Sequence, residues 1–231
     1  MTFGILLIVS YLIGSIPFAL IVGKIFKGID IRNFGSGNLG STNAIRTLGL
    51  PLGLLVQILD IAKGLVVVLL VSTFFYDVLP FSNHTPFEDI TLVKIMAGCC
   101  AVLGHTFSIF VNFRGGKGIN TGLGVFISLA PIDVLLALGV FALILLSSGY
   151  VSLGSIIAAI FFPLIMFVRE NFFHVNTYGY NTLIIFSIAV SVLIIYNHRS
   201  NIKRLLYGDE NQFKNLWLIR ILKIKTPLSK P

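Results

Sequence analysis

Residues 119–148 read INTGLGVFISLAPIDVLLALGVFALILLSS, an apolar run with Pro131 near its middle. Read as one helix kinked at Pro131, this run gives the chain six membrane spans. Read as two helices, 119–130 and 132–148, it gives seven. The first piece is short, because twelve helical residues reach only about 18 Å, against a hydrocarbon layer of roughly 30 Å. Seven spans therefore require that neighbouring helices shield it, or that the bilayer is thin there.

The composition of the whole chain places it in a membrane. Of its 231 residues, 56% are hydrophobic and 11% are charged, and the mean hydropathy is +0.95. A soluble domain carries about 25% charged residues. We therefore predict an all-α integral membrane protein, with residues 1–231 forming a single polytopic domain. The expected spans are 3–23, 52–75, 92–112, 119–130, 132–148, 151–168 and 181–197.

The charged residues between the spans set the orientation. Basic residues follow the first, third and last spans, whereas Asp77, Glu88 and Asp89 lie between the second and the third. The positive-inside rule places the basic segments, about 24–50, 113–118 and 198–231, in the cytoplasm. An outside N-terminus and a cytoplasmic C-terminus then require an odd number of spans. The charges therefore favour seven.

The net charge of +8 does not indicate nucleic-acid binding, because the basic residues are spread between hydrophobic segments. This spread fits membrane orientation and anionic lipid. Cys99 and Cys100 are adjacent and no zinc-ligand spacing is present. We therefore expect no metal and no cofactor.

The first cytoplasmic segment is Gly-Ser-Gly-Asn-Leu-Gly-Ser-Thr-Asn-Ala-Ile-Arg, residues 35–46. Its glycines allow backbone amides to approach an anion. A short helix is expected from Ser41 to Gly49, with Thr42, Asn43 and Arg46 on one face. A hydroxyl, an amide and a guanidinium on that face would suit a phosphate. The alternative is a polar turn whose arginine only sets orientation.

The second segment, residues 113–122, reads FRGGKGINTG. It is not a Walker A sequence, but a glycine-rich turn that opens a helix with Lys117 beside it favours anion binding. The alternative is a basic loop with small residues for close helix packing.

The third segment, residues 198–210, reads HRSNIKRLLYGDE, and His198 and Asn201 share a face if the last helix continues. The alternative is a basic juxtamembrane stretch that binds anionic lipid. Within the spans, Asp60 and Lys63 are spaced for an ion pair, because buried charges in membranes usually pair. His105 is expected to pack and to support the loop that follows it.

These residues resemble the acyl-phosphate-dependent glycerol-3-phosphate acyltransferases of bacterial phospholipid synthesis (PlsY). The resemblance extends over nearly the whole chain, and Ser41 and Asn120 depart from it, since the family usually has alanine at both positions. It is carried by Gly14-Ser15-Ile16-Pro17, the residue 35–46 segment, Asp60-x-x-Lys63-Gly64, Gly104-His105-x-Phe107, Gly-Gly-Lys-Gly at 115–118, Tyr150-Val151-Ser152-Leu153 and Asn201-Ile202-x-Arg204-Leu205-x-x-Gly208-x-Glu210.

The resemblance implies transfer of a fatty acyl group from acyl phosphate to the sn-1 hydroxyl of glycerol 3-phosphate, giving 1-acylglycerol 3-phosphate and phosphate. It implies a multi-pass protein of the bacterial inner membrane whose active site faces the cytoplasm. The expected partners are these two substrates and membrane lipid, with no obligate protein partner.

The residues expected to carry this chemistry come from all three segments. The catalytic set is Ser36, Arg46, Lys117, His198 and Asn201. The substrate-binding set is Asn38, Thr42, Asn43, Gly115, Gly116, Gly118, Thr121, Ser152, Arg204 and Glu210. Either His198 or a substrate phosphate oxygen would take the proton of the attacking hydroxyl. Glu210 would bind the glycerol hydroxyls or only brace Arg204.

A transporter or flippase for a phosphorylated small molecule would also need cationic groups and helix ends at a phosphate. Its charged groups should lie near the middle of the bilayer. Those of this chain are expected at one face, which favours the enzyme.

Overall fold

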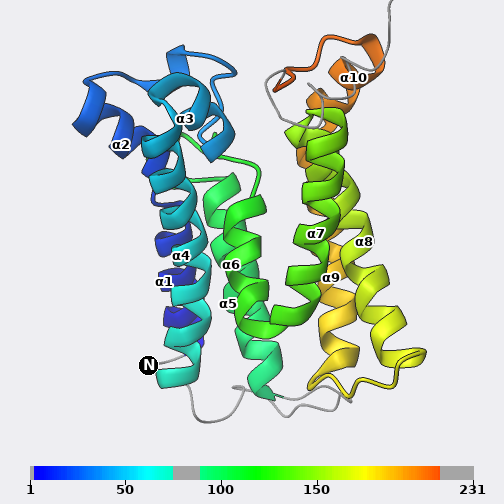
Figure 1. Ribbon diagram of the computed structural model, residues 1–231. Helices are drawn as coiled ribbons and strands as arrows, with labels where there is room; N and C mark the ends of the chain where they lie inside the picture. Colours follow the sequence, from blue (N-terminus) through cyan, green and yellow to red (C-terminus); the bar gives the residue numbers. More distant parts are fainter. Residues whose placement is uncertain (1–2, 75–88, 214–231) are drawn as a thin grey trace, which may run out of the picture. The chain divides into compact units, whose positions relative to one another are not determined.

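The computed structural model of the protein describes residues 3–74 and 89–213, and all regular structure within them is helical (Figure 1). The helices are α1 Phe3–Ser15, α2 Phe18–Lys27, α3 Ser41–Leu48, α4 Leu50–Phe74, α5 Asp89–Thr106, α6 Ile119–Leu129, α7 Pro131–Ser148, α8 Val151–Asn171, α9 Tyr180–Asn197 and α10 Arg199–Tyr207, with short 3-10 helices η1 Ile31–Asn33 and η2 Ile109–Val111. The predicted all-α membrane fold is confirmed.

Six segments among the described residues are long and apolar enough to cross a bilayer, and one further apolar helix, α6, has 11 residues. The helical conformation is interrupted at Ala130, and Pro131 is the first residue of α7. At this position a residue has no helical partner for its N–H, so the missing N–H of proline removes no hydrogen bond. The predicted division of residues 119–148 into two helices is confirmed. The count of seven spans stays a prediction, because it depends on how α6 lies in the membrane.

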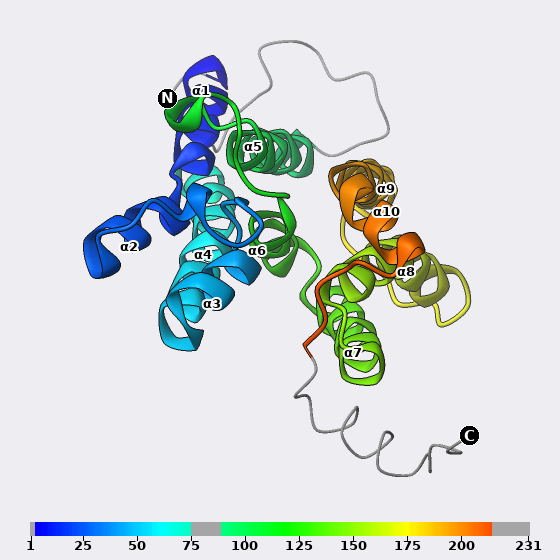
Figure 2. The same cartoon turned by 90° about the horizontal axis from the view of Figure 1, so that it is seen from above.

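The first predicted span, residues 3–23, is not one helix. The chain leaves the helical conformation at Ile16 and Pro17, and α2 starts at Phe18. Proline disfavours the helical conformation in the residue before it and has no N–H to donate, which explains the break. Figures 1 and 2 show α2 turned aside from α1.

The described residues divide into two compact units, and the expectation of a single polytopic domain stays a prediction. The first unit comprises residues up to 131 together with 176–190, and the second comprises 132–175 together with 191 onward. In the first unit α1 packs against α5, and α4 packs against α3, α5 and α6.

Glycines allow the helices of the first unit to approach closely. A Cβ atom at Gly14 of α1 would overlap the carbonyl oxygen of Ala101 on α5. A Cβ at Gly64 of α4 would overlap the Thr121 carbonyl of α6, and one at Gly124 of α6 would overlap that of Ile61. Small residues facing each other are the usual route to tight helix contact in membranes. The short helix α6 is therefore held tightly against α4.

The second unit contains a buried ion pair between two of its helices. Asp133 in the first turn of α7 is 2.6 Å from Arg169 in the last turn of α8. In the same unit the hydroxyl of Ser191 on α9 donates to the carbonyl of Ala159 on α8 at 2.6 Å.

Candidate active site

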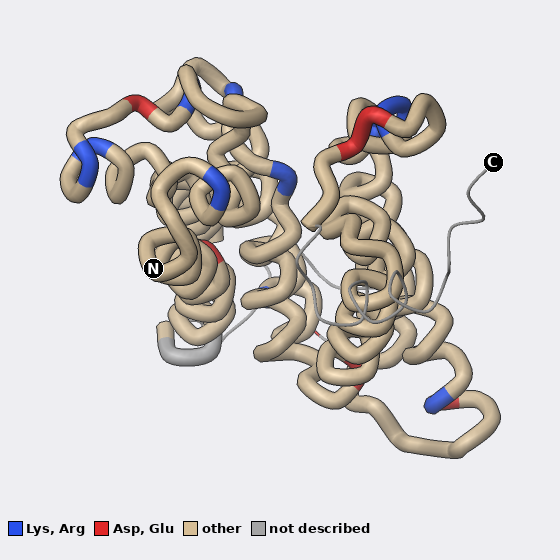
Figure 3. The backbone as a smooth tube through the Cα atoms, turned by 45° about the horizontal axis from the view of Figure 1, so that its top comes forward, with Lys and Arg blue, Asp and Glu red and all other residues tan. Residues whose placement is uncertain are grey.

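In the first unit, several lysines and arginines gather around α2, α3 and the loop before α6 (Figure 3). One of them, Arg32, is already engaged, because Asp30 caps η1 and its carboxylate lies 2.6 Å from the Arg32 guanidinium. Hydrogen bonds from the Arg32 side chain lower the pKa of Asp30 to about 2. Arg46 of α3, by contrast, is exposed.

The loop that leads into α3 is organised by Asn43. Its amide nitrogen donates to the carbonyls of Phe34 and Asn38, both at 3.1 Å, and its Oδ1 accepts from the N–H of Ser36 at 2.9 Å. The side chain is only 2% exposed. The sequence predicted that Asn43 would contact substrate. In the structure its side-chain amide instead forms hydrogen bonds that hold the loop containing Ser36.

Helix α3 has the predicted bounds, beginning at Ser41 and ending before Gly49. The predicted common face of Thr42, Asn43 and Arg46 is only partly observed, since these side chains are half-buried, buried and exposed respectively. Asn38 stays half-buried, and its Oδ1 accepts from the N–H of Gly40 at 3.0 Å. Ser36 is exposed at the tip of the loop.

The second segment differs from the phosphate loop expected from its glycines. The N–H of Gly115 donates to the carbonyl of Thr106, and the N–H of Gly116 donates to the carbonyl of His105, both at 3.0 Å. Because α5 ends at Thr106, no N–H group of a following helical turn reaches these two carbonyls, and the N–H groups of the loop donate to them instead. In this structure both amides donate within the protein, and their contact with phosphate stays a prediction.

The need for glycine in this loop comes from packing and backbone conformation. A Cβ at Gly115 would overlap the His105 carbonyl oxygen, and one at Gly116 would overlap the His105 ring. Gly118 is the N-cap of α6 and has a left-handed φ of 80°, which favours glycine. Lys117, half-buried, sits between Gly116 and Gly118 at the start of α6.

One hydrogen bond joins the first two segments. The side-chain amide of Asn120, in the first turn of α6, donates to the hydroxyl of Ser41, in the first turn of α3, at 2.8 Å. This hydrogen bond brings the starts of α3 and α6 together, and the phosphate site expected from these segments stays a prediction.

Thr121 does not fit its predicted role. The residue is fully buried, with its carbonyl packed on Gly64 of α4. A direct contact with substrate is therefore not supported by its position.

A buried charged cluster lies behind the second segment. The ammonium group of Lys63 on α4 is 3.0 Å from the Asp60 carboxylate and 2.8 Å from Nδ1 of His105 on α5. It also donates to the carbonyl of Ile16 at 3.1 Å. The sequence predicted the ion pair of Asp60 and Lys63, which is confirmed. Its link to His105, 42 residues away, had no local signal.

In the second unit, the Glu210 carboxylate accepts hydrogen bonds from three predicted site residues. Its Oε1 accepts from Asn201 at 2.7 Å and from Ser152 at 2.9 Å, and its Oε2 accepts from Arg204 at 2.7 Å. Burial raises the pKa of Glu210, but these hydrogen bonds outweigh it and hold the pKa below its ordinary value. Of the two roles considered for Glu210, the structure has the bracing one.

The imidazole of His198 has a defined tautomer. Its Nδ1 lies 2.8 Å from the carbonyl oxygen of Ile194, which can only accept, so Nδ1 carries the hydrogen. The lone pair is then on Nε2, the atom that could take up a proton. His198 and Asn201 are both buried at the start of α10. Residues 214–231 of the predicted segment 198–231 lie outside the described residues.

Comparison with known proteins gives the family. The model of the glycerol-3-phosphate acyltransferase family matches residues 4–208. The chain belongs to this family. Glycerol-3-phosphate acyltransferases of Chlorobium chlorochromatii and Chlorobaculum tepidum are 46% and 45% identical, over 90% and 92% of this chain and 95% and 97% of the relatives.

Solved structures of the family agree with this assignment. The crystal structure of PlsY (YgiH), an integral membrane glycerol 3-phosphate acyltransferase in its glycerol 3-phosphate form, is 38% identical, with a TM-score of 0.77 over 95% of this chain and 98% of that one. A second structure of PlsY, in its lysophosphatidic acid form, matches with the same identity and TM-score. The predicted family is confirmed.

The bond between Ser41 and Asn120 can be tested by a double-mutant cycle. Ser41→Ala and Asn120→Ala should each lower the free energy of unfolding by about 0.5–1.5 kcal/mol, the net value of one hydrogen bond. The double variant should lose little more than one single variant, as measured by denaturant unfolding in detergent.

Ser128→Ala provides the control, because its hydroxyl bonds within α6 to Gly124 at 3.3 Å and touches neither partner. Its effect should add to that of Asn120→Ala. Additive losses for Ser41→Ala and Asn120→Ala would contradict the coupling.

Proposed function

We propose that the protein transfers a fatty acyl group from acyl phosphate to the sn-1 hydroxyl of glycerol 3-phosphate, giving 1-acylglycerol 3-phosphate and phosphate. The observation that carries the proposal is the hydrogen bond that joins the starts of α3 and α6, because their two segments also contain Ser36, Arg46 and Lys117. Both substrates are phosphate esters or anhydrides, and this arrangement offers cations and helix N-termini to phosphate.

An acyl phosphate is a mixed anhydride and needs no further activation, so positioning and charge stabilisation supply most of the catalysis. The sn-1 hydroxyl oxygen attacks the acyl carbonyl carbon and forms the ester bond. The bond from that carbon to the phosphate oxygen breaks, and phosphate leaves with the bonding electrons. No acyl-enzyme forms in this scheme.

The proposed substrate contacts are divided among the residues of the first two segments. Lys117 offsets the charge that develops on the leaving phosphate, while Ser36 and Arg46 hold phosphate oxygens. We propose Asn38, Thr42 and Gly118 as further residues that contact substrate. Asn43, Gly115 and Gly116 act on the loops rather than on the substrate, because their polar groups are already used.

The proton of the attacking hydroxyl has two possible acceptors, Nε2 of His198 and a phosphate oxygen of the substrate. The Glu210 carboxylate holds three side chains in place by accepting their hydrogen bonds, namely those of Asn201, Ser152 and Arg204. We therefore assign Ser152 and Arg204 to positioning in the second unit, with His198 and Asn201 as its residues that contact substrate.

The reaction can be measured with purified protein in detergent. Acyl phosphate and glycerol 3-phosphate should give equal amounts of 1-acylglycerol 3-phosphate and inorganic phosphate, and acyl-coenzyme A should not replace acyl phosphate. A transporter needs two compartments and would give no turnover in detergent. Absence of product from folded protein would exclude the proposed reaction.

Lys117→Ala should lower turnover by about 10²–10³-fold, the usual cost of losing one preorganised electrostatic group. Thermal unfolding in detergent should be nearly unchanged, because the half-buried side chain adds little packing. Lys24→Ala, an exposed lysine of α2, is the matched control and should keep full turnover. Turnover of Lys117→Ala within tenfold of the unchanged protein would remove Lys117 from the proposed mechanism.

We also propose a bacterial inner membrane location with an outside N-terminus, seven spans and the three segments in the cytoplasm. Single cysteines at the exposed positions Phe34, Arg114 and Ser200 should be shielded from an impermeant thiol reagent outside intact cells. A cysteine at position 84, outside the described residues, should be labelled. Cys99 and Cys100 are replaced beforehand. Labelling at position 200 with protection at 34 would establish six spans instead.

A further inference from the structure

The cluster of Asp60, Lys63 and His105 is almost completely buried within the first unit, with exposed fractions of 1%, 4% and 6%. An ammonium group has three N–H donors and no acceptor. Lys63 donates to the carbonyl of Ile16 and to Nδ1 of His105, and its nitrogen lies 3.0 Å from the Asp60 carboxylate as an ion pair. The proposed mechanism uses none of these groups.

The cluster fixes the orientation of the His105 ring. Because Lys63 can only donate, Nδ1 of His105 accepts, and the hydrogen of the neutral ring is on Nε2. The Nε2 edge points at Gly116, where an added Cβ would overlap it. The ring is therefore held between Lys63 on one side and the second segment on the other.

The backbone of the same residue supports the loop. The His105 carbonyl accepts from Gly116 and the Thr106 carbonyl accepts from Gly115, both at 3.0 Å. The residue after these glycines is Lys117. A change in the position of His105 therefore moves the loop that carries Lys117.

We propose that Asp60, Lys63 and His105 are positioning residues that set the place of the 115–117 loop, and with it the affinity for the phosphate group held there. This inference rests on the proposed function. Buried ion pairs often add little to stability compared with hydrophobic residues of the same volume. What an apolar replacement would lack is the directed hydrogen bond that holds the imidazole against Gly116.

The proposal predicts that Gly116 must be glycine because of the His105 ring. Gly116→Ala should raise KM for glycerol 3-phosphate or for acyl phosphate by about tenfold or more, with a smaller effect on kcat. His105→Asn keeps an acceptor near the position of Nδ1 and removes the Nε2 edge. In the His105→Asn background, Gly116→Ala should raise the same KM by less than about threefold.

Gly115→Ala is the matched control. Its Cβ meets the backbone carbonyl of His105, which no side-chain change removes. Its effect on KM should therefore be the same with His105 or Asn at position 105. If His105→Asn does not fold, as judged by thermal unfolding in detergent, His105→Ser replaces it, since a serine hydroxyl also accepts from Lys63.

The charged pair is tested by removing both charges together, which leaves no uncompensated charge. Asp60→Asn with Lys63→Met should fold and raise the same KM by about tenfold. Asp133→Asn with Arg169→Met removes an ion pair from the second unit in which Asp133 is buried and Arg169 half-buried. That variant should leave both KM values within about twofold.

These measurements separate the inference from the function on which it rests. No turnover by the unchanged protein would refute the proposed function. Turnover by that protein, with Gly116→Ala equally harmful in both backgrounds, would overturn the inference and leave the function intact. Equal effects on KM of Asp60→Asn with Lys63→Met and of Asp133→Asn with Arg169→Met would also overturn the inference.

Discussion

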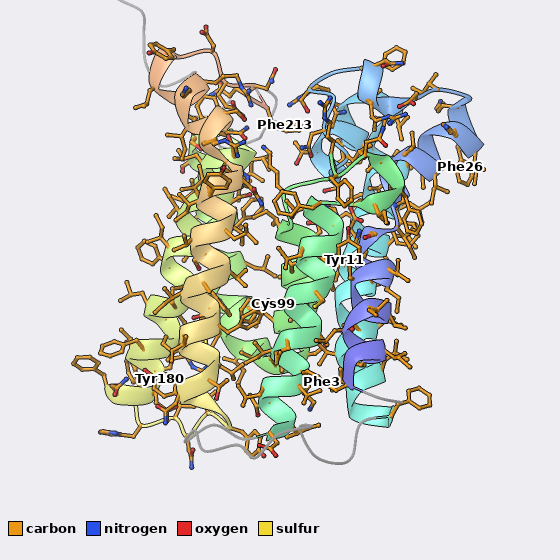
Figure 4. All side chains as sticks on the ribbon, turned by 180° about the vertical axis from the view of Figure 1, so that it is seen from behind. Phe3, Tyr11, Phe26, Cys99, Tyr180 and Phe213 are labelled. Atoms are coloured by element: carbon orange, nitrogen blue, oxygen red, sulfur yellow. The ribbon has the colours of Figure 1, made fainter. Side chains whose placement is uncertain are left out.

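The contacts of the Lys63 ammonium group hold together the helix ends of the first unit. The Ile16 carbonyl, at the break before Pro17, accepts from the N–H of Phe18 at 3.1 Å and also from the ammonium group of Lys63. The same group balances the Asp60 charge and holds the His105 ring. One cation thus joins the turn between α1 and α2 to the end of α5. Tyr11 of α1, labelled in Figure 4, adds a second link by donating to the Phe107 carbonyl at 2.7 Å.

The sequence predicted those features that follow from local pattern. Apolar length located the long helices, Pro131 separated α6 from α7, and Gly49 ended α3. Proline also gave the one clear local error, since Pro17 was placed inside a helix although it disfavours helix in the residue before it. Features that depend on contacts distant in sequence were not predicted. Examples are the bond of Ser152 to Glu210, 58 residues apart, and that of Lys63 to His105.

The glycine-rich segment shows that glycines in a loop can serve either anion binding or close packing against a neighbouring helix. Its glycines suggested amides aimed at phosphate, whereas Gly115 and Gly116 donate to the end of α5. Sequence alone cannot distinguish the two uses, because both require a backbone without a Cβ atom. The close packing on His105 decides between them. The sequence did carry a signal for this packing, since His105 was expected to support the loop that follows it.

The spacing of Asp60 and Lys63 also bears on how the protein is made. Each charge alone would oppose entry of α4 into the bilayer by about 2.5–3.5 kcal/mol at the helix centre. The two residues stand three apart on one helix and pair at 3.0 Å. Their pairing needs only the helix that carries them, so it can form while α4 is still leaving the translocation channel. His105 belongs to the next span and joins them only after that span has been inserted.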